Sequence, residues 1–375
     1  MTSLDALATP ALLLDQTVLL SNLNAMRERM ARHGVALRPH LKTAKSARIA
    51  ELAIGGNAGG ITVSTLKEAA YFFDHGITDI TYAVVMAPSK LGEATALQSR
   101  GARLTIIIDS AFGARAIAEH VAAHGMGFCV LIEVDTGDGR SGVLPESELL
   151  LDVGQILDAA PGVEFRGVLT HAGHSYHCRG PREIRLVARE ERDGVIRAAQ
   201  RLRAAGLPSP VVSAGSTPTA VHAELLEGVT EMRPGVFMFN DLQQLALGAC
   251  TRADLALSVF ASVIAHNRHA GHLLLDAGGL ALSKDVGANE FRPELGYGEV
   301  CDADLVPLPN LFVSGVSQEH GRVPMSDPRS FDLLPIGAKV RILPNHACLT
   351  AAAYDTYHVI KNGVVVDRWD RINGW

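Results

Sequence analysis

Eight short apolar runs alternate with longer alanine-rich segments along residues 36–233, and this alternation narrows the choice of fold more than any other pattern. The runs lie near residues 36–40, 60–63, 78–83, 103–108, 128–134, 165–170, 210–213 and 229–233. Helical segments such as 110–124 and 183–205 separate them. Strands that alternate with helices form parallel sheets, and eight such units in about 210 residues match a (β/α)8 barrel. A doubly wound sheet is the alternative, which periodicity alone does not exclude.

A strand and a helix precede the first of these units. Residues 10–14 form an apolar run that predicts a strand ending at Asp15. The Asp15 carboxylate can accept hydrogen bonds from the first free amides of a helix, so we expect it to cap one. Leucine and methionine then recur at helical spacing, and His33-Gly34 is expected to end the helix.

The pattern of apolar and polar residues changes after Cys250. Short runs of alternating apolar and polar residues follow, at 256–264, 272–276, 311–316, 339–343 and 364–368. Glycine and proline separate these runs, which is typical of an antiparallel β domain. We therefore expect an α/β fold in two domains, a (β/α)8 barrel over residues 1–250 and a mainly antiparallel β domain over residues 251–375. Residues 1–15 are also suited to join the β domain.

Composition and charge exclude several classes of protein. The 375 residues are 47% hydrophobic and 20% charged, the balance of a compact protein rather than a disordered one. The net charge of −6 argues against a nucleic-acid-binding surface, which needs a basic face. We expect no membrane span, which needs about 18 continuous apolar residues, and no export signal, which needs a basic and apolar start. Five scattered cysteines without a Cys-x-x-Cys pair indicate reduced thiols and a cytoplasmic protein.

A lysine follows the first barrel strand, in the stretch from Arg38 to Lys45 that contains Lys42. Side chains at the C-terminal ends of barrel strands project into the mouth of the barrel. We therefore expect Lys42 to be partly desolvated, and burial lowers the pKa of a lysine. A neutral amine can form a Schiff base with an aldehyde cofactor. The simpler alternative is a lysine whose ammonium extends into water.

Two later strands are also followed by polar side chains. Arg140 lies in the glycine-broken loop 135–142 after the fifth strand, where it can contact a cofactor oxygen; a solvated arginine on a surface turn is the alternative. His171 follows the sixth strand, and its imidazole can stack on a flat ring, although a structural histidine is the simpler interpretation. Tyr176 lies close by in the sequence and is able to donate a proton.

The loop after the seventh strand, residues 213–219, contains Gly215, Ser216 and Thr217. Small residues let the backbone approach an anion, and hydroxyls at a helix N-terminus can bind phosphate. An ordinary helix cap explains the same residues. Residues 233–235, Arg-Pro-Gly, follow the eighth strand, and the loops after strands seven and eight form a recurrent phosphate site in barrels. We expect both loops to serve one anion.

The β domain carries its own candidate site at His346 and Cys348. Side chains two residues apart on an extended strand point the same way, and imidazole with thiolate suits zinc. Two ligands cannot complete a structural zinc site, so a metal held there would keep open positions. A buried cysteine beside a satisfied histidine is the alternative. Residues 318–321, which include Glu319 and His320, form a second polar cluster that either faces the same site or is a solvated turn.

Four motifs together give the chain a resemblance to a known family. They are Arg-Pro-His-Leu-Lys-Thr-Ala-Lys-Ser, Ile-Thr-Val-Ser-Thr-Leu-Lys-Glu-Ala, Gly-Ser-Thr-Pro-Thr and Asn-His-Ala-Cys. The chain resembles the D-serine dehydratase-like family, also represented by D-threo-3-hydroxyaspartate dehydratases, over nearly its whole length. These enzymes use pyridoxal phosphate (PLP) and share the alanine-racemase type of barrel and β domain, PLP fold type III. The barrel of this chain would then be its PLP-binding domain.

The resemblance implies a role for each candidate residue. Lys42 would be the Schiff-base lysine, and Tyr176 is kept as a second catalytic candidate because of its position near His171. The residues that would hold the cofactor phosphate and ring, together with Lys42, are His40, Arg140, His171, Gly215, Ser216, Thr217 and Gly235. His346 and Cys348 would bind a divalent metal, with zinc expected first and manganese or magnesium as alternatives. The family is typically a homodimer in which one subunit's β domain covers the barrel mouth of the other.

The resemblance also implies a reaction, the elimination of water from a β-hydroxy D-amino acid such as D-threo-3-hydroxyaspartate or D-serine to give a keto acid and ammonia. Related D-threonine and D-3-hydroxyaspartate aldolases carry His-x-Asp at the metal site, so His-x-Cys favours the dehydratases. Retro-aldol cleavage to glycine and an aldehyde is the alternative. A PLP-carrying regulatory protein and an amino-acid racemase are more distant possibilities. Phe237 stands where relatives usually have tyrosine, so one phosphate or ring contact is expected to differ.

Overall fold

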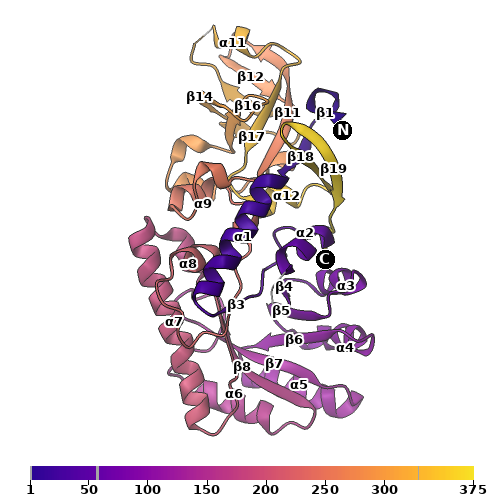
Figure 1. The fold of residues 1–375 in the computed structure, drawn as a ribbon, viewed down its shortest axis with the longest axis vertical. Helices are drawn as coiled ribbons and strands as arrows, with labels where there is room; N and C mark the ends of the chain where they lie inside the picture. The colour runs from indigo at the N-terminus through magenta and orange to yellow at the C-terminus, as the bar shows by residue number, and fades with distance from the viewer. Residues whose placement is uncertain (1, 56–58, 328) are drawn as a thin grey trace. The chain divides into compact units, whose positions relative to one another are not determined.

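The computed structural model describes residues 2–55, 59–327 and 329–375 (Figure 1). The chain divides into two compact units. One, called the barrel unit, comprises Ala25–Gly235 and Gly374–Trp375; the other, called the β unit, comprises Met1–Asn24 and Val236–Asn373. The division falls inside helix α1, Gln16–Arg32.

Helix α1 begins where the sequence predicts. The Asp15 side chain accepts hydrogen bonds from the backbone amides of Thr17 and Val18 at 2.9 and 3.1 Å. The helix ends before Gly34, which adopts a left-handed φ of +67°. The capping prediction at Asp15 is therefore confirmed, because a carboxylate satisfies amides that have no partner inside the helix.

The barrel unit contains an eight-stranded parallel sheet. Its strands are β3 Ala36–Leu37, β4 Ile61–Val63, β5 Asp79–Val85, β6 Arg103–Ile108, β7 Phe128–Val134, β8 Val163–Thr170, β9 Val211–Ala214 and β10 Glu231–Met232. They read as apolar runs because strands covered on both faces bury both sets of side chains. Ile107, Leu131 and Leu169 of three neighbouring strands pack together in the core.

The sheet curls into a barrel. Neighbouring strands follow the order β4 to β10, and β3 then pairs with β10. A bridge between His40 and Thr62 joins the segment after β3 to β4, with the Leu41 amide donating to the Thr62 carbonyl at 2.8 Å. The two edges of the sheet therefore meet, which confirms the predicted barrel and excludes an open doubly wound sheet.

Helices flank the barrel strands (Figure 1). They are α2 Ala47–Ile54, α3 Leu66–Asp74, α4 Leu91–Ser99, α5 Ala111–His124, α6 Glu148–Asp158, α7 Pro181–Ala204 and α8 Thr217–His222. Each of α3, α5 and α6 begins at a Ser or Thr whose side-chain oxygen accepts a backbone amide of the first turn. The connections that follow the strands place polar residues at one end of the barrel, where the candidate site lies.

The described part of the β unit contains an 11-stranded sheet. Its strands are β1 Thr2–Ser3, β2 Ala11–Asp15, β11 Leu257–Asn267, β12 His272–Leu275, β13 Glu299–Cys301, β14 Pro307–Phe312, β15 Gly315–Val316, β16 Gly321–Pro324, β17 Lys339–Leu343, β18 Thr356–Lys361 and β19 Val364–Asp370. All pairings are antiparallel except that of β2 with β18. The short helices are α9 Leu242–Leu247, α10 Gly279–Leu282, α11 Ser330–Leu333 and α12 Ala347–Ala351. The mainly antiparallel character predicted for the C-terminal part is confirmed.

Within the described residues, no helix is both long enough and apolar enough to cross a membrane.

Candidate active site

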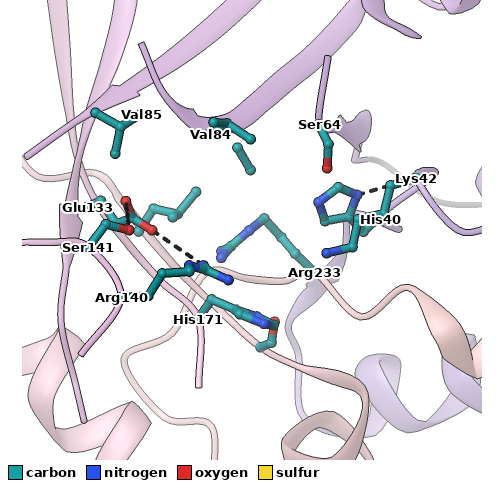
Figure 2. A pocket seen from close by; sticks show the side chains of 13 residues that line it. His40, Lys42, Ser64, Val84, Val85, Glu133, Arg140, Ser141, His171 and Arg233 are labelled. Carbon is teal, nitrogen blue, oxygen red and sulfur yellow. Dashed lines mark hydrogen bonds and ion pairs between the residues drawn. The ribbon is translucent and has the colours of Figure 1, made fainter. Parts of the chain in front are cut away.

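The barrel unit contains a cavity of about 400 Å³ at the C-terminal ends of its strands. It is lined by His40, Lys42, Ser64, Ala83, Val84, Val85, Glu133, Arg140, Ser141, Leu169, His171, Gly215 and Arg233. Figure 2 shows His40 and Lys42 at one side of the cavity and Glu133 and Ser141 at the other. The volume lies within the range of small-molecule sites, about 300–1,000 Å³. Five residues that the sequence singled out as cofactor ligands, His40, Lys42, Arg140, His171 and Gly215, thus share one cavity.

Lys42 lies on the turn 41–44 that follows β3. Its backbone amide donates to the Nδ1 atom of His40 at 3.4 Å, the dashed contact in Figure 2. The residue is exposed, so the predicted partial desolvation of Lys42 is wrong for this chain. The physical reason is its position on a turn beyond the strand, where its side chain reaches the cavity but remains open to water.

Two imidazoles in the cavity wall are held neutral. Burial and the cations of Lys42 and Arg140 lower the pKa of His171 to about 3, against the opposing hydrogen bond to the Gly215 carbonyl at 3.2 Å. Burial, followed by Lys42 and Arg233, lowers the pKa of His40 well below its usual value. Because a carbonyl can only accept, Nδ1 of His171 carries its proton. Both rings therefore present flat, uncharged faces at neutral pH.

Glu133 is a cavity residue that the sequence analysis did not single out. Its side chain is 5% exposed on β7, and it accepts a hydrogen bond from the Ser141 hydroxyl at 2.8 Å. Burial raises the pKa of Glu133, opposed by Ser141 and by Arg140. Arg140 is 3.9 Å from Glu133 and 3.8 Å from Asp138, and its side chain is 58% exposed. Its guanidinium is therefore only weakly engaged by the protein and is available to an anion.

Arg233 supplies a second guanidinium in the cavity wall. It is buried, and it donates to the Ser213 hydroxyl and to the carbonyls of Ala214 and Thr170. Burial lowers the pKa of Arg233 to about 10, against the nearby carboxylates. It therefore stays charged at neutral pH. With Lys42 and Arg140 it makes the cavity attractive to a small anion.

In the loop after β9, the hydroxyl groups of Ser216 and Thr219 cap helix α8. The Ser216 hydroxyl accepts the Thr219 amide at 3.3 Å, and the Ser216 amide donates to the Thr219 hydroxyl at 3.0 Å. This reciprocal capping box starts α8, so the side chains serve the helix, the alternative weighed from the sequence. Among the described residues, the cavity wall includes Gly215 but not Ser216, Thr217 or Gly235. Phosphate contacts from these three residues stay a prediction.

Gly235 also has a packing reason to be glycine. A Cβ atom there would lie 3.0 Å from the His40 carbonyl and 3.1 Å from the Thr43 hydroxyl. The chain after β10 therefore runs close against the turn that carries Lys42. Tyr176, the second predicted catalytic residue, is half-buried, and its ring centroid lies 6.5 Å from that of His171.

Glu191 on α7 connects two of the site loops and was missed by the sequence analysis. Its side chain is 1% exposed, and its Oε1 atom accepts the backbone amides of Ala172 and Gly215, both at 2.9 Å. Burial raises the pKa of Glu191, opposed by these hydrogen bonds. The carboxylate therefore fixes the His171 loop to the Gly215 loop. Nothing in the local sequence separates this acid from the solvated acids around it.

We expect Glu191→Ala to lower the free energy of unfolding by about 2–6 kcal/mol, because two buried amides lose their acceptor at roughly 1–3 kcal/mol each. Urea denaturation followed by circular dichroism measures the change. Glu191→Gln keeps an acceptor oxygen and should lose less. The exposed neighbour Glu190 provides the matched control, Glu190→Ala, which should change little. Equal stability of the two alanine variants would contradict the role given to Glu191.

The β unit places the candidate metal ligands at the junction between β17 and α12. His346 is the N-cap of α12 and Cys348 lies in its first turn, so the predicted extended strand through this motif is wrong. The two side chains nevertheless lie close enough for Cys348 to raise the pKa of His346. The two side chains are therefore not brought together by the alternation of a strand. They lie close because the extended residue His346 is followed directly by the first turn of α12.

His346 is held between anionic groups. Its Nδ1 atom lies 2.7 Å from the carboxylate of Asp285. Burial lowers the pKa of His346, but Cys348 and Asp285 outweigh burial and raise it to about 11. Zinc binds a neutral imidazole and a thiolate, so an ion held by this pair would displace the extra proton of His346. Among the described residues, no group of three or more His, Cys, Asp or Glu side chains is arranged to hold a metal, so an ion bound by this pair would keep open positions.

Residues 318–320, in the second polar cluster of the β unit, form a solvent-exposed turn. Glu319 and His320 are exposed, and the Ser317 amide donates to the His320 carbonyl at 2.8 Å in the turn between β15 and β16. Phe237, where the resemblance leads us to expect a tyrosine in relatives, is buried in the β unit.

Two family models match the chain. The model of the alanine racemase N-terminal domain matches residues 14–243, and the model of a putative serine dehydratase domain matches residues 256–360. D-threo-3-hydroxyaspartate dehydratase of Delftia sp. (strain HT23) is 45% identical over 374 residues, covering 98% of both chains. Its solved structure matches with a TM-score of 0.97 at 44% identity, covering 100% of both chains. One further solved structure is a cysteine-to-alanine mutant of D-threo-3-hydroxyaspartate dehydratase in the metal-free form.

Two other relatives match over most of the chain. D-serine dehydratase of Dictyostelium discoideum is 33% identical, covering 95% of this chain and 94% of its own. D-threonine aldolase of Arthrobacter sp is 31% identical, covering 96% of this chain and 91% of its own.

Proposed function

The chain belongs to the family that contains D-threo-3-hydroxyaspartate dehydratase and the D-serine dehydratases, and on that premise we propose that it is a PLP- and metal-dependent dehydratase. Its substrates would be β-hydroxy D-amino acids such as D-threo-3-hydroxyaspartate or D-serine, and its products a keto acid and ammonia. The observation that carries this proposal is the full-length similarity to the dehydratases, which spans both units.

The cavity of the barrel unit fits PLP chemically. Lys42 supplies the primary amine that an aldehyde cofactor needs. Arg140 and Arg233 supply positive charge for a phosphate and for ring oxygens, and the neutral rings of His40 and His171 can lie against a flat heterocycle. We propose that Gly215, Ser216, Thr217 and Gly235 complete the phosphate site. Bound there, PLP would supply the electron sink that makes the substrate α-carbon acidic.

The chain's own groups would then move the protons. Lys42 Nζ would be the base that removes the α-proton. Its exposure leaves a route for a substrate to enter. Tyr176, which is half-buried near His171, is the proposed second proton carrier. His171 stays neutral and donates its Nδ1–H to the Gly215 carbonyl. It would therefore position a cofactor ring rather than exchange protons.

His346 and Cys348 would hold the divalent metal, which we propose to be zinc, with manganese or magnesium as alternatives. Two protein donors leave positions for substrate or water. A metal there would supply Lewis-acid assistance to a departing hydroxyl group, which is a poor leaving group.

The experiment that tests the reaction is a product assay. D-Serine, D-threonine and both D-3-hydroxyaspartates are incubated with the PLP-loaded enzyme, with and without a chelator, and ammonia is scored against glycine. We expect ammonia and a keto acid, with turnover falling when the metal is removed. The aldolase alternative is favoured by the similarity to D-threonine aldolase. Glycine and an aldehyde without ammonia would reject dehydration.

We also propose a cytoplasmic homodimer as the working form. The described cysteines form no disulfides, which suits a reducing compartment. Leu280, Leu333 and Ile336 of the β unit are exposed by 60%, 75% and 63%, and large exposed apolar side chains mark surfaces that a partner can cover. Light scattering at micromolar concentration would contradict the dimer if it gave the mass of one chain.

A further inference from the structure

One carboxylate of the β unit faces the candidate metal ligand from a separate segment of the chain. Asp285 Oδ2 lies 2.7 Å from His346 Nδ1, and Asp285 Oδ1 accepts the Gly287 amide at 2.9 Å. The Asp285 amide in turn donates to the Ser283 hydroxyl at 3.2 Å. The carboxylate is therefore fixed on its own loop before it meets the imidazole, and both of its oxygens are engaged.

The backbone around His346 is fixed independently of Asp285. The buried Asp241 accepts the Ala347 amide at 2.9 Å and the Gln244 amide at 2.9 Å. The Asn345 side chain donates to the Gly296 carbonyl at 2.7 Å. With the residues on either side of His346 held in this way, the remaining freedom is rotation of the imidazole itself, and only a partner of the ring can remove it.

We propose that Asp285 is the positioning residue of the metal site. Its carboxylate accepts a hydrogen bond from His346 Nδ1–H and so holds the ring with Nε2 left for the ion. The inference deepens the proposed function and rests on it, because it takes His346 as a metal ligand. A metal-binding histidine commonly donates its other ring N–H to a carboxylate, which fixes the tautomer and makes the ligand more basic. Asp285 is not assigned as a third ligand, since no group of three or more His, Cys, Asp or Glu side chains in the described residues is arranged to hold a metal.

The decisive measurement is zinc affinity rather than turnover. Zinc is titrated into PLP-loaded protein in competition with a chromophoric chelator, for wild type, Asp285→Ala and Asp285→Asn. Loss of such a partner typically weakens metal binding by about 10–100-fold, and we expect Asp285→Ala to lie in that range. Asp285→Asn keeps an oxygen that can accept the Nδ1 proton, so it should recover part of the loss. The matched control is Asp332→Ala, because Asp332 is in the same unit and its side chain is 77% exposed.

A parallel Cys348→Ala titration separates this inference from the proposed function. If Cys348→Ala loses zinc while Asp285→Ala binds it as tightly as wild type, the positioning role is overturned and the metal pair stands. If both variants bind zinc like wild type, the metal pair itself is overturned. The melting temperature of the metal-free proteins excludes a general loss of structure, because a purely structural role would lower it in Asp285→Ala and Asp285→Asn without the graded change in zinc affinity.

Discussion

Lys42→Ala should abolish both turnover and the visible absorption of the PLP-loaded protein. The visible band requires the cofactor to be joined to an amine of the protein, and Lys42 is the lysine of the cavity wall. The same nitrogen is proposed to remove the α-proton, so its loss takes away a nucleophile and a base together. We expect kcat/KM to fall by at least about 1,000-fold, because groups that act as a unit in catalysis have effects of this size. Absorbance spectroscopy and an ammonia assay measure the two losses separately.

The exposure of Lys42 also allows a rescue experiment. The residue is exposed at the cavity, so a small external amine such as methylamine should be able to enter and restore part of the turnover of Lys42→Ala. The control is Lys90→Ala, since Lys90 is an exposed lysine of the same unit, on the short 3-10 helix Pro88–Lys90. Retention of the visible band in Lys42→Ala, or its loss in Lys90→Ala, would remove Lys42 from the proposed role.

The barrel was predictable because its strands are buried on both faces. A strand such as β6, with Ile106, Ile107 and Ile108 all fully buried, reads as a continuous apolar run, and each run is separated from the next by a helix. The eight predicted runs therefore coincide with the eight strands β3 to β10. The candidate site residues just beyond those runs were predictable for the same reason, since a parallel barrel brings the C-terminal ends of all its strands to one end of the barrel.

The β unit was less predictable, because several of its strands, such as β14 and β19, are half-exposed and others carry residues typical of turns. Strand β16, Gly321–Pro324, begins with glycine and ends with proline, both of which argue against a strand. Strand β18, Thr356–Lys361, was also missed, although a signal was present. Asn362 and Gly363 after it have φ values of +51° and +75°, the Asn-Gly turn that joins β18 to β19 as a hairpin.

Three acids of the candidate sites were missed for a common physical reason. Glu133 and Glu191 are buried and Asp285 is half-buried. Their roles depend on partners outside their own segment, as in the 2.9 Å contacts of Glu191 with Ala172 and Gly215. Local sequence does not distinguish a buried acid from a solvated one. The expected desolvation of Lys42 failed similarly, because a strand-end rule was applied to a residue that lies on a turn.

Cys348→Ala should remove the metal and leave the PLP site intact. Cys348 belongs to the β unit, whereas the cavity-lining residues belong to the barrel unit, so we expect an unchanged visible spectrum. With one of two protein donors gone, zinc affinity should fall by at least about 100-fold, more than for loss of a partner behind a ligand. Elemental analysis after dialysis measures the metal content. Wild-type metal content in Cys348→Ala would contradict the site, and loss of the PLP spectrum would contradict the independence of the two sites.

Cys348→Asp tests why the motif contains a thiol. A carboxylate is a harder ligand than a thiolate, and it suits manganese or magnesium better than it suits zinc. The variant should therefore bind a divalent ion again, but with its preference for zinc over manganese reduced by at least about tenfold. Asp285 would still orient His346, because its hydrogen bond at 2.7 Å does not involve residue 348. Competition between zinc and manganese gives the ratio. If Cys348→Asp kept the wild-type preference, the thiolate would not be the group that selects the metal, and the choice of zinc would have to come from His346 and the open positions.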